Sequence, residues 1–237
     1  MRTAQAVAWK EIQLYFNSPT AYIVGLIFLA LTGFFFVQDL GDPFPEATLG
    51  PFFEAATIIF ILLAPALTMR LIAEEQKLGT IELLLTSPVR DWEVIIGKYV
   101  ASLVFFLTLV AMSFFYAILL FIFASPDPGP IYAGYLGLIL YGAAALSIGL
   151  LTSTMTSNQI VAAVVAMGIL LALFFADRAF GAVGGLVGEI IGGMGLVSHF
   201  DDFKRGVIET KHIVYFLSVT VFFLFLSVRV LDSRRWR

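Results

Sequence analysis

The sequence predicts an all-α integral membrane protein with six transmembrane helices. Its 237 residues are 60% hydrophobic and 13% charged, whereas soluble domains average about 45–50% apolar and about 25% charged residues. This apolar surplus is too large for a folded core to bury. The apolar residues also form uncharged runs of the ~20 residues that cross a bilayer as a helix. Together these observations make the bilayer the solvent of most of the chain.

Six runs reach a membrane-spanning length. The first covers residues 19–37, where Pro19 suits the first helical position. The second covers residues 51–69, and Pro65 is expected to kink it. Residues 99–125 carry no charge and are long enough to cross at a tilt. The three remaining runs are 131–151, 160–176 and 213–228.

Two further segments are apolar without being clear spans. Residues 1–18 mix charges with Trp9 and Tyr15 and predict a helix in the membrane interface, or else an ordinary helical leader. Residues 177–212 are rich in glycine and contain Glu189, which favours a pair of short helices that enter the membrane partway from the outer side. A full crossing by residues 179–197 stays an alternative.

The positive charges predict the orientation. With six spans the two termini share a side, and that side holds two Lys or Arg in the leader, four in 70–98 and four in the tail. These make ten of the 14 basic residues. The positive-inside rule then places both termini in the cytoplasm.

Residues 70–98 form the one sizeable cytoplasmic loop of this topology and are dense in charge. We expect the second span to continue as a helix to Lys77 and to end at Gly79, because glycine adopts the left-handed cap conformation. Thr80 suits the N-cap of a short helix, and Ser87 with Pro88 starts the next one. The loop is therefore predicted to be a rigid chain of short helices.

The middle of this loop, IELLLT at 81–86, predicts an exposed apolar tip. Leu83, Leu84 and Leu85 would form a patch that needs a partner. Docking of another protein explains the patch, and so does a helix that folds back into the membrane interface.

Several chemistries are excluded by the composition. There is no cysteine, and no G-x-x-x-x-G-K-[ST] motif that would cradle a nucleotide. A histidine-rich zinc site needs more than His199 and His212. No charge lies at mid-depth of a span, where ion-coupled carriers need one. We therefore expect no catalytic, cofactor or metal residues and no nucleic-acid partner, and any transport energy must come from outside the chain.

Residues 69–100 resemble the knuckle of the type 2 ABC export permeases. The family pattern E-E-x-x-x-G-T-x-E-x-L-x-x-x-P matches at seven positions, and the order of segments is similar over essentially the whole chain. Within the family, the gliding-motility-associated permease subunit is the nearest likeness, on the stretches 17–24, 151–162 and 199–220, while a branch that serves copper-enzyme maturation stays possible. The matching positions are Glu74, Glu75, Gly79, Thr80, Glu82, Leu84 and Pro88.

The resemblance implies a half-transporter in the bacterial inner membrane. Two membrane subunits would pair, the second being another copy or a related subunit with a large periplasmic domain. Two cytoplasmic ABC ATPase subunits, which hold ATP and Mg²⁺, would dock beneath them, with residues 70–98 as the coupling region. The expected interface residues are Glu74, Glu75, Gly79, Thr80, Glu82, Leu83, Leu84 and Pro88, with Lys10 and Glu11 on the leader helix.

Two other function classes stay open. An energised device could act on an outer partner or on lipid without exporting anything, and a passive anchor could hold a complex in the membrane. The dense charges between Asp201 and Lys211 could contact a periplasmic partner or form a solvated loop whose ion pairs are worth about 0–1 kcal/mol each. The cargo is not predicted.

Overall fold

The computed structural model describes residues 2–40, 47–81, 89–183 and 192–234, and this part of the chain is helical apart from its turns. Six of its helices are long and apolar enough to cross a membrane, as predicted. The helices run in the order α1 (Arg2–Phe16), α2 (Pro19–Leu40), α3 (Gly50–Thr68), α4 (Ala73–Lys77), α6 (Asp91–Phe123), α7 (Pro128–Met155), α8 (Gln159–Val183), α10 (Leu196–Lys204) and α11 (Thr210–Arg234).

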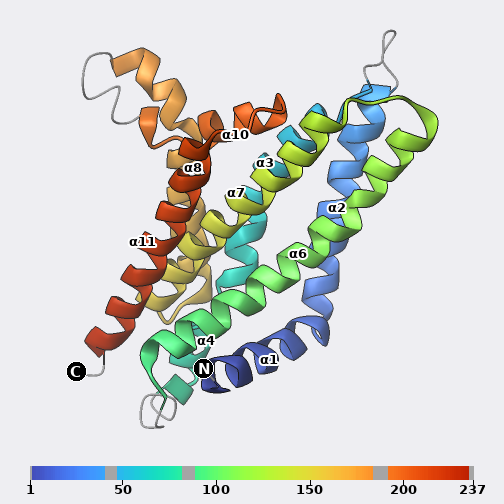
Figure 1. Cartoon of the computed structure of the whole chain (residues 1–237). Helices are drawn as coiled ribbons and strands as arrows, with labels where there is room; N and C mark the ends of the chain where they lie inside the picture. The colour runs from blue at the N-terminus through green and yellow to red at the C-terminus, as the bar shows by residue number, and fades with distance from the viewer. Residues whose placement is uncertain (1, 41–46, 82–88, 184–191, 235–237) are drawn as a thin grey trace.

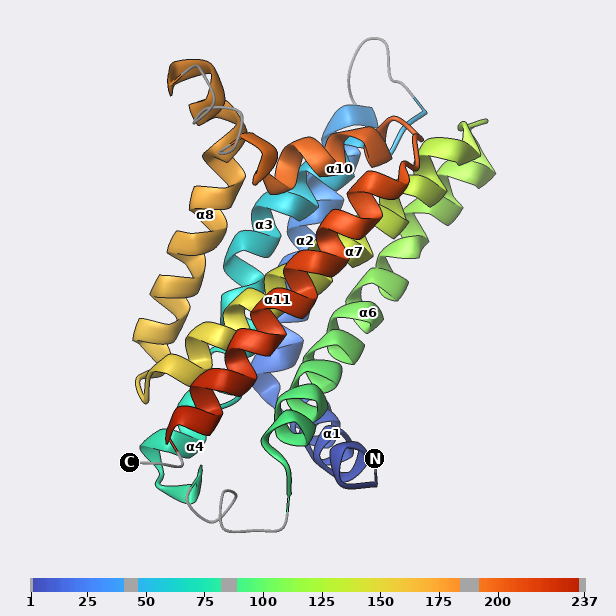
Figure 2. The same ribbon diagram turned by 60° about the vertical axis from the view of Figure 1, so that its left-hand side comes forward.

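The two ends of the bundle carry different elements. The start of α1, the end of α11, the short α4 and the start of α6 all lie at one end, which we call the terminal end (Figure 1). At the other end, which we call the opposite end, α10 lies across α3, α7 and α11 (Figure 2). An even number of spans requires this shared side for the termini, as the sequence predicted.

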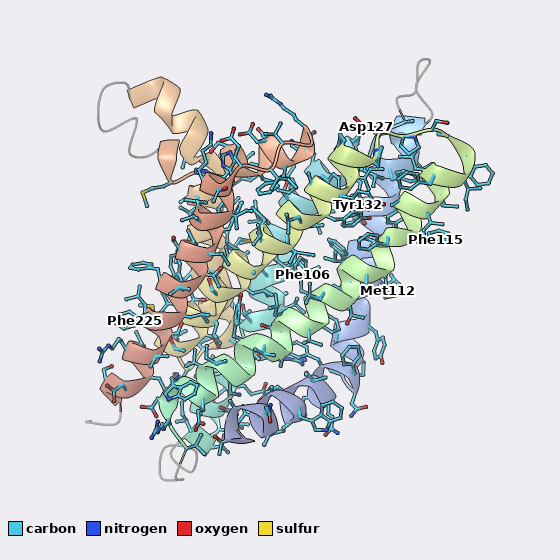
Figure 3. The ribbon with its side chains drawn as sticks, viewed as in Figure 1. Phe106, Met112, Phe115, Asp127, Tyr132 and Phe225 are labelled. Atoms are coloured by element: carbon cyan, nitrogen blue, oxygen red, sulfur yellow. The ribbon has the colours of Figure 1, made fainter. Side chains whose placement is uncertain are left out.

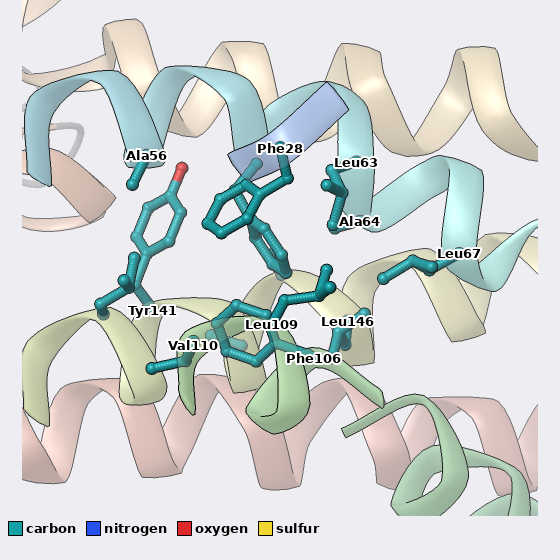
Figure 4. Packing of buried hydrophobic residues seen from close by; sticks show 14 of the residues in the cluster. Phe28, Ala56, Leu63, Ala64, Leu67, Phe106, Leu109, Val110, Tyr141 and Leu146 are labelled. Carbon is teal, nitrogen blue, oxygen red and sulfur yellow. The ribbon is translucent and has the colours of Figure 1, made fainter. Parts of the chain in front are cut away.

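Helix α7 forms the centre of the bundle. In its most apolar stretch, 78% of the residues are buried inside the bundle. The corresponding share is 28% for α2, 22% for α8 and 17% for α11. Phe106 and Leu109 of α6 pack with Tyr141 and Leu146 of α7 (Figure 4). Glycine in a membrane helix lets a neighbour approach closely, and here Gly142 receives the ring of Phe106.

The outer faces of the spans are apolar as well. Met112 and Phe115 lie on α6 and Phe225 lies on α11, and all three point away from the bundle (Figure 3). Their exposed fractions are 56%, 58% and 53%. Such residues on a helix that crosses a bilayer contact lipid, so the composition is explained by two apolar surfaces, one facing the core and one facing the membrane.

Tyrosine hydroxyls fasten neighbouring helices to one another. In each pair the phenol donates to a main-chain carbonyl of another helix, which satisfies a buried hydroxyl without introducing charge. The pairs are Tyr99 to Ala143 at 3.1 Å, Tyr116 to Leu29 at 2.7 Å, Tyr135 to Ser113 at 2.9 Å and Tyr141 to Thr57 at 3.2 Å.

Several helix boundaries differ from the prediction. The second span ends at Thr68 instead of continuing to Lys77, and residues 69–72 form a turn before α4. The next helix begins at Asp91 rather than at Ser87 and Pro88, which lie outside the described residues. Its first turn closes when the Arg90 amide donates to Glu93 Oε2 at 3.3 Å.

The connection between the predicted spans 131–151 and 160–176 is also shorter than predicted. Helix α7 continues to Met155 because its hydroxyls bond within the helix: Thr152 donates to the Gly149 carbonyl at 2.8 Å and Thr154 to that of Leu151 at 2.6 Å. A hydroxyl bonded in this way need not break a helix. Asn158 then caps α8, accepting from the Ile160 amide at 2.9 Å.

The structure describes part of the glycine-rich segment. The candidate span in α8 covers Gln159–Ala176, close to the predicted 160–176. The helix itself continues to Val183, and α10 is one short helix before the last span. Residues 184–191 lie outside the described residues, so the expected pair of re-entrant helices is not tested as a whole. None of the six candidate spans in the described chain falls within 184–209.

Candidate functional site

Three segments far apart in the sequence meet at the terminal end: α1, α4 and the first turns of α6 (Figures 1 and 2). Helix α1 packs along the start of α6, where Gly97 provides the contact. A Cβ built on Gly97 would lie 2.9 Å from the Ala4 carbonyl oxygen and 2.9 Å from Val7 Cγ1. Only glycine therefore lets the two backbones approach this closely.

A buried lysine joins the three segments. Lys98 Nζ of α6 lies 2.8 Å from Glu11 Oε1 of α1 and 2.9 Å from Glu75 Oε1 of α4. The Lys98 side chain is 2% exposed, against 9% for Glu11 and 20% for Glu75. Burying a charge is costly unless it is paired, so this arrangement holds only while all three segments stay together. We call these residues the lysine triad.

Lys10 adds a second positive charge at the edge of the triad. Its ammonium lies 4.0 Å from Glu75 Oε1 on a side chain that is 65% exposed. An exposed pair at this distance contributes little. The triad therefore depends on Lys98, which the sequence reading did not single out, rather than on Lys10, which it did.

A serine of α7 holds the turn between α3 and α4. Ser153 Oγ accepts from the amides of Ile72 and Ala73, each at 3.1 Å, and donates to the Met69 carbonyl at 3.0 Å. Gln76 of α4 adds a bond to the Thr154 carbonyl at 2.9 Å. These bonds satisfy two amides at the start of α4 and a carbonyl just after the end of α3, and so stabilise the turn that separates α3 from α4.

Tyr15 fastens the end of α1 to α3. Its buried hydroxyl donates to the Leu67 carbonyl at 2.6 Å, and its ring stacks on Phe105 with centroids 5.3 Å apart. The Arg70 guanidinium lies 5.2 Å above the same ring, and Arg70 Nη1 donates to Ser18 Oγ at 3.3 Å. Cation–π contact of this kind contributes about 0.5–1 kcal/mol at an exposed site.

A cleft of about 690 Å³ opens beside the triad, between α1 and α4. Charged and polar residues of both helices line it together with a few leucines. Such a mixed lining suits contact with a soluble protein surface. The residues around it are Lys10, Glu11, Leu14, Tyr15, Asn17, Ser18, Arg70, Leu71, Glu74, Glu75, Leu78, Thr80 and Lys98.

Gly79 and Thr80 follow α4 at the edge of the cleft. Gly79 has φ of +71°, the left-handed conformation that was predicted from the glycine. Thr80 and Ile81 are helical, and the Thr80 hydroxyl donates to the Glu75 carbonyl at 3.3 Å. Four of the predicted interface residues, Glu82, Leu83, Leu84 and Pro88, lie outside the described residues, as does the expected apolar tip.

The structure thus brings together most of the predicted residues that it describes. Lys10, Glu11, Glu75 and Thr80 line one cleft, while Glu74 is exposed at its rim. Lys98, Arg70 and Ser153 were missed. A signal existed for Lys98, because a lysine directly after Gly97 at the start of a long apolar run must find a partner. No local signal connects Ser153 with a turn 80 residues earlier.

The opposite end has its own ion cluster. Lys204 Nζ of α10 lies 2.7 Å from Asp201 Oδ1 and 3.0 Å from Glu54 Oε1 of α3. Partial burial lowers the pKa of Lys204, but the hydrogen bonds that its ammonium donates to Asp201 and Glu54 outweigh this effect and raise that pKa above its ordinary value. His212 Nε2 lies 2.7 Å from Asp202 Oδ2. These pairs tie α10 to α3 and α11.

His199 belongs to the same end but has a packing role. Its ring stacks on Tyr215 with centroids 3.8 Å apart, and its Nδ1 lies 2.8 Å from the Gly195 carbonyl oxygen. Within the described residues, no three His, Cys, Asp or Glu side chains are grouped so that they could hold a metal ion. The terminal end is the candidate site because α1, α4 and α6 share buried polar contacts there.

Comparison with known proteins identifies the family of this architecture. The model of the ABC-2 family transporter proteins matches residues 48–190, which include α3, α4 and the charged loop. YbhR of Escherichia coli K12, described as a probable multidrug ABC transporter permease, is 31% identical over 106 residues, or 44% of this chain and 27% of YbhR.

YbhS of the same organism carries the same description. It is 33% identical over 113 residues, which make up 48% of this chain and 29% of YbhS. The chain thus matches less than a third of the length of these relatives. The family match covers more than half of the chain, and its six spans and charged loop fit it: this protein is a member of the ABC-2 family of transporter proteins.

Proposed function

We propose that this chain is the permease subunit of an ATP-driven transporter in the bacterial inner membrane, and that a separate ABC ATPase supplies the energy. Residues 70–98 form the coupling region in this proposal. The observation that carries it is the lysine triad, because it joins α1, α4 and the start of α6 through a buried charge. A force applied to α4 would therefore act on α1 and α6 as well.

The path from this region into the membrane is short. Helix α6 continues from Asp91 to Phe123 without a break, so the triad lies on the first turns of a span. Ser153 connects the same turn to α7, the central helix. A movement of α4 would thus be passed on to α6 through the ion pairs of the lysine triad and to α7 through the Ser153 hydrogen bonds, because packed rigid elements move together.

The orientation follows from the charges. Basic residues are concentrated in α1, in residues 70–98 and in the tail, and the described parts of these three regions lie at the terminal end (Figure 1). Under the positive-inside rule this end faces the cytoplasm, where a soluble ATPase would meet the cleft between α1 and α4.

The complete transporter in this proposal contains two ATPase subunits, which hold ATP and Mg²⁺, and a second membrane subunit. That subunit is either another copy of this chain or a related protein with a large periplasmic domain. The chain itself contributes the membrane path and the docking surface. The family match and the two relatives do not support the gliding-motility subtype that the sequence suggested.

Co-purification tests the proposal. The chain is expressed with an ABC ATPase of the same organism, and the ATPase retained on the tagged permease is quantified. Glu82→Ala with Leu84→Ala should reduce retention at least about tenfold, the loss of ~1.4 kcal/mol of binding. The matched control, Ile208→Ala with Glu209→Ala, changes an apolar and an acidic residue at the opposite end. Equal retention by both double variants would show that docking lies elsewhere.

A further inference from the structure

A second cleft, of about 410 Å³, lies at the terminal end between α2, α3 and the start of α8. It shares Tyr15, Arg70 and Glu74 with the cleft beside the triad but extends in a different direction, into the membrane-spanning part. Its lining is Tyr15, Ala21, Ile23, Val24, Ala66, Leu67, Met69, Arg70, Glu74 and Gln159.

The walls of this cleft are apolar and belong to the spans. Ala21, Ile23 and Val24 lie in the first turns of α2, and Ala66 and Leu67 lie in the last turn of α3. Ile23 is 58% exposed, so the cleft borders the lipid-facing side of α2. A soluble protein has no access to such walls, whereas an acyl chain does.

The rim of the cleft carries two opposite charges, both just beyond the end of α3. Arg70 follows the last residue of α3 by two positions, and Glu74 lies one helical turn further on. The Arg70 guanidinium is positioned by the Tyr15 ring and by Ser18 Oγ. Guanidinium groups bind phosphate through a planar fork of donors. A carboxylate beside it would repel a purely anionic headgroup but would accept from an ammonium.

From this juxtaposition we propose that the cleft binds phosphatidylethanolamine, a phospholipid with a zwitterionic amine headgroup. Its phosphate would lie at Arg70, its ammonium at Glu74 and one acyl chain between α2 and α3. Phosphatidylglycerol lacks the ammonium, and the trimethylated ammonium of phosphatidylcholine has no N–H to donate to Glu74. Basic side chains between membrane helices bind the phosphates of lipid headgroups, and here Glu74 adds an acceptor for an ammonium. This proposal does not depend on an ATPase partner.

Thermal unfolding of the purified full chain in detergent tests the proposal. Phosphatidylethanolamine, phosphatidylglycerol and phosphatidylcholine with identical acyl chains are titrated separately. Phosphatidylethanolamine should raise the Tm by about 4 °C or more at saturation, because a ligand that binds only the folded state stabilises it. Phosphatidylcholine and phosphatidylglycerol should each raise it by less than half as much.

Three variants assign the headgroup contacts. Arg70→Gln should abolish the excess rise with phosphatidylethanolamine, and Glu74→Gln should reduce that rise to the phosphatidylglycerol level. Arg229→Gln should leave it unchanged. Arg229 is a matched control because its guanidinium also lies over an aromatic ring, 5.1 Å from the Phe225 centroid, but it does not line the cleft.

Each other outcome overturns the proposal. Equal rises with the three lipids would show that the headgroup is not recognised. An undiminished rise in Arg70→Gln or Glu74→Gln would place the lipid elsewhere. Soluble phosphoethanolamine serves as the probe for a water-soluble ligand: if it raises the Tm as much as the lipid does, the cleft binds a phosphate ester and not a membrane lipid.

Discussion

Two lysines at opposite ends of the bundle each bridge a pair of carboxylates, with similar distances. Lys98 lies 2.8 and 2.9 Å from Glu11 and Glu75, and Lys204 lies 3.0 and 2.7 Å from Glu54 and Asp201. Their burial differs: the Lys98 side chain is 2% exposed and that of Lys204 is 17%, while Glu54 is 66% exposed. Water can replace the partners of Lys204 but not those of Lys98.

This difference in burial means that the Lys98 cluster holds helices together, whereas the Lys204 cluster is a surface contact. Removing one partner of a buried ion pair costs about 3–5 kcal/mol, because the remaining charge is left in a low dielectric. Exposed pairs contribute about 0–1 kcal/mol. The terminal end is therefore expected to hold its three segments firmly, whereas α10 at the opposite end is held mainly by apolar packing, with Phe200 and Phe203 buried.

The largest expected effect is that of Lys98→Met. It leaves Glu11 and Glu75 with only the exposed Lys10, 4.0 Å from Glu75, as a nearby cation, and should lower the free energy of unfolding by about 3–5 kcal/mol. Denaturant unfolding of the purified chain in detergent measures this. Adding Glu11→Gln and Glu75→Gln to Lys98→Met should recover at least half of the loss. A loss below about 1 kcal/mol would mean that water reaches the triad.

Gly97→Ala should have the next largest effect. The added Cβ would meet the Ala4 carbonyl oxygen and Val7, and overpacking of this kind costs about 1–3 kcal/mol. Gly168→Ala is the control, since no atom lies within 4 Å of a Cβ at that position. The control should be neutral or slightly stabilising, and equal losses in the two variants would place α1 away from α6.

Ser153→Ala comes third. It removes the acceptor of the Ile72 and Ala73 amides, and buried unsatisfied groups cost about 1–3 kcal/mol. Hydrogen exchange of these two amides should accelerate at least tenfold relative to the amides of α11. Ser233→Ala, which removes an exposed hydroxyl bonded only to its own helix, should not change them. Unchanged exchange in Ser153→Ala would show that the turn is held by other contacts.

The smallest effect is expected for Lys204→Met, about 0–1 kcal/mol. Because the folded-state pKa of Lys204 is raised, its contribution is fully present below the pKa of an unfolded lysine and is lost as the pH rises through the raised value. Salt should also remove most of it, since exposed pairs are screened. Unfolding at low and high salt would show this contrast, with the effect of Lys98→Met persisting. The reverse salt dependence would contradict the assignment of burial.

The sequence predicted the spans well because their signal is local. An uncharged run of about 20 residues has few alternatives to a membrane helix, and Pro19 begins α2 as expected. Gly79 adopts the predicted left-handed conformation for a similarly local reason. The helix ends were less predictable, because Thr152 and Thr154 satisfy their hydroxyls within α7 instead of ending it.

The candidate site was predicted only in its outline. Glu75 and Glu11 were selected from the charged loop and the leader, but their meeting at Lys98 depends on the packing of α1 against α6. Ser153 is bonded to a turn that only tertiary structure places beside it. Such contacts connect positions that are 23 to 87 residues apart, and no local pattern encodes them.

Site-specific cross-linking tests most directly whether the terminal end receives the ATPase. The chain has no cysteine, so single cysteines can be placed at Thr80, exposed beside the cleft, and at Glu209 at the opposite end, whose side chain is 44% exposed. In membranes that contain the ATPase that co-purifies with the chain, Thr80→Cys should cross-link to it and Glu209→Cys should not. Cross-linking from Glu209→Cys, or labelling of Thr80→Cys in intact cells by a reagent that cannot cross the membrane, would contradict the account.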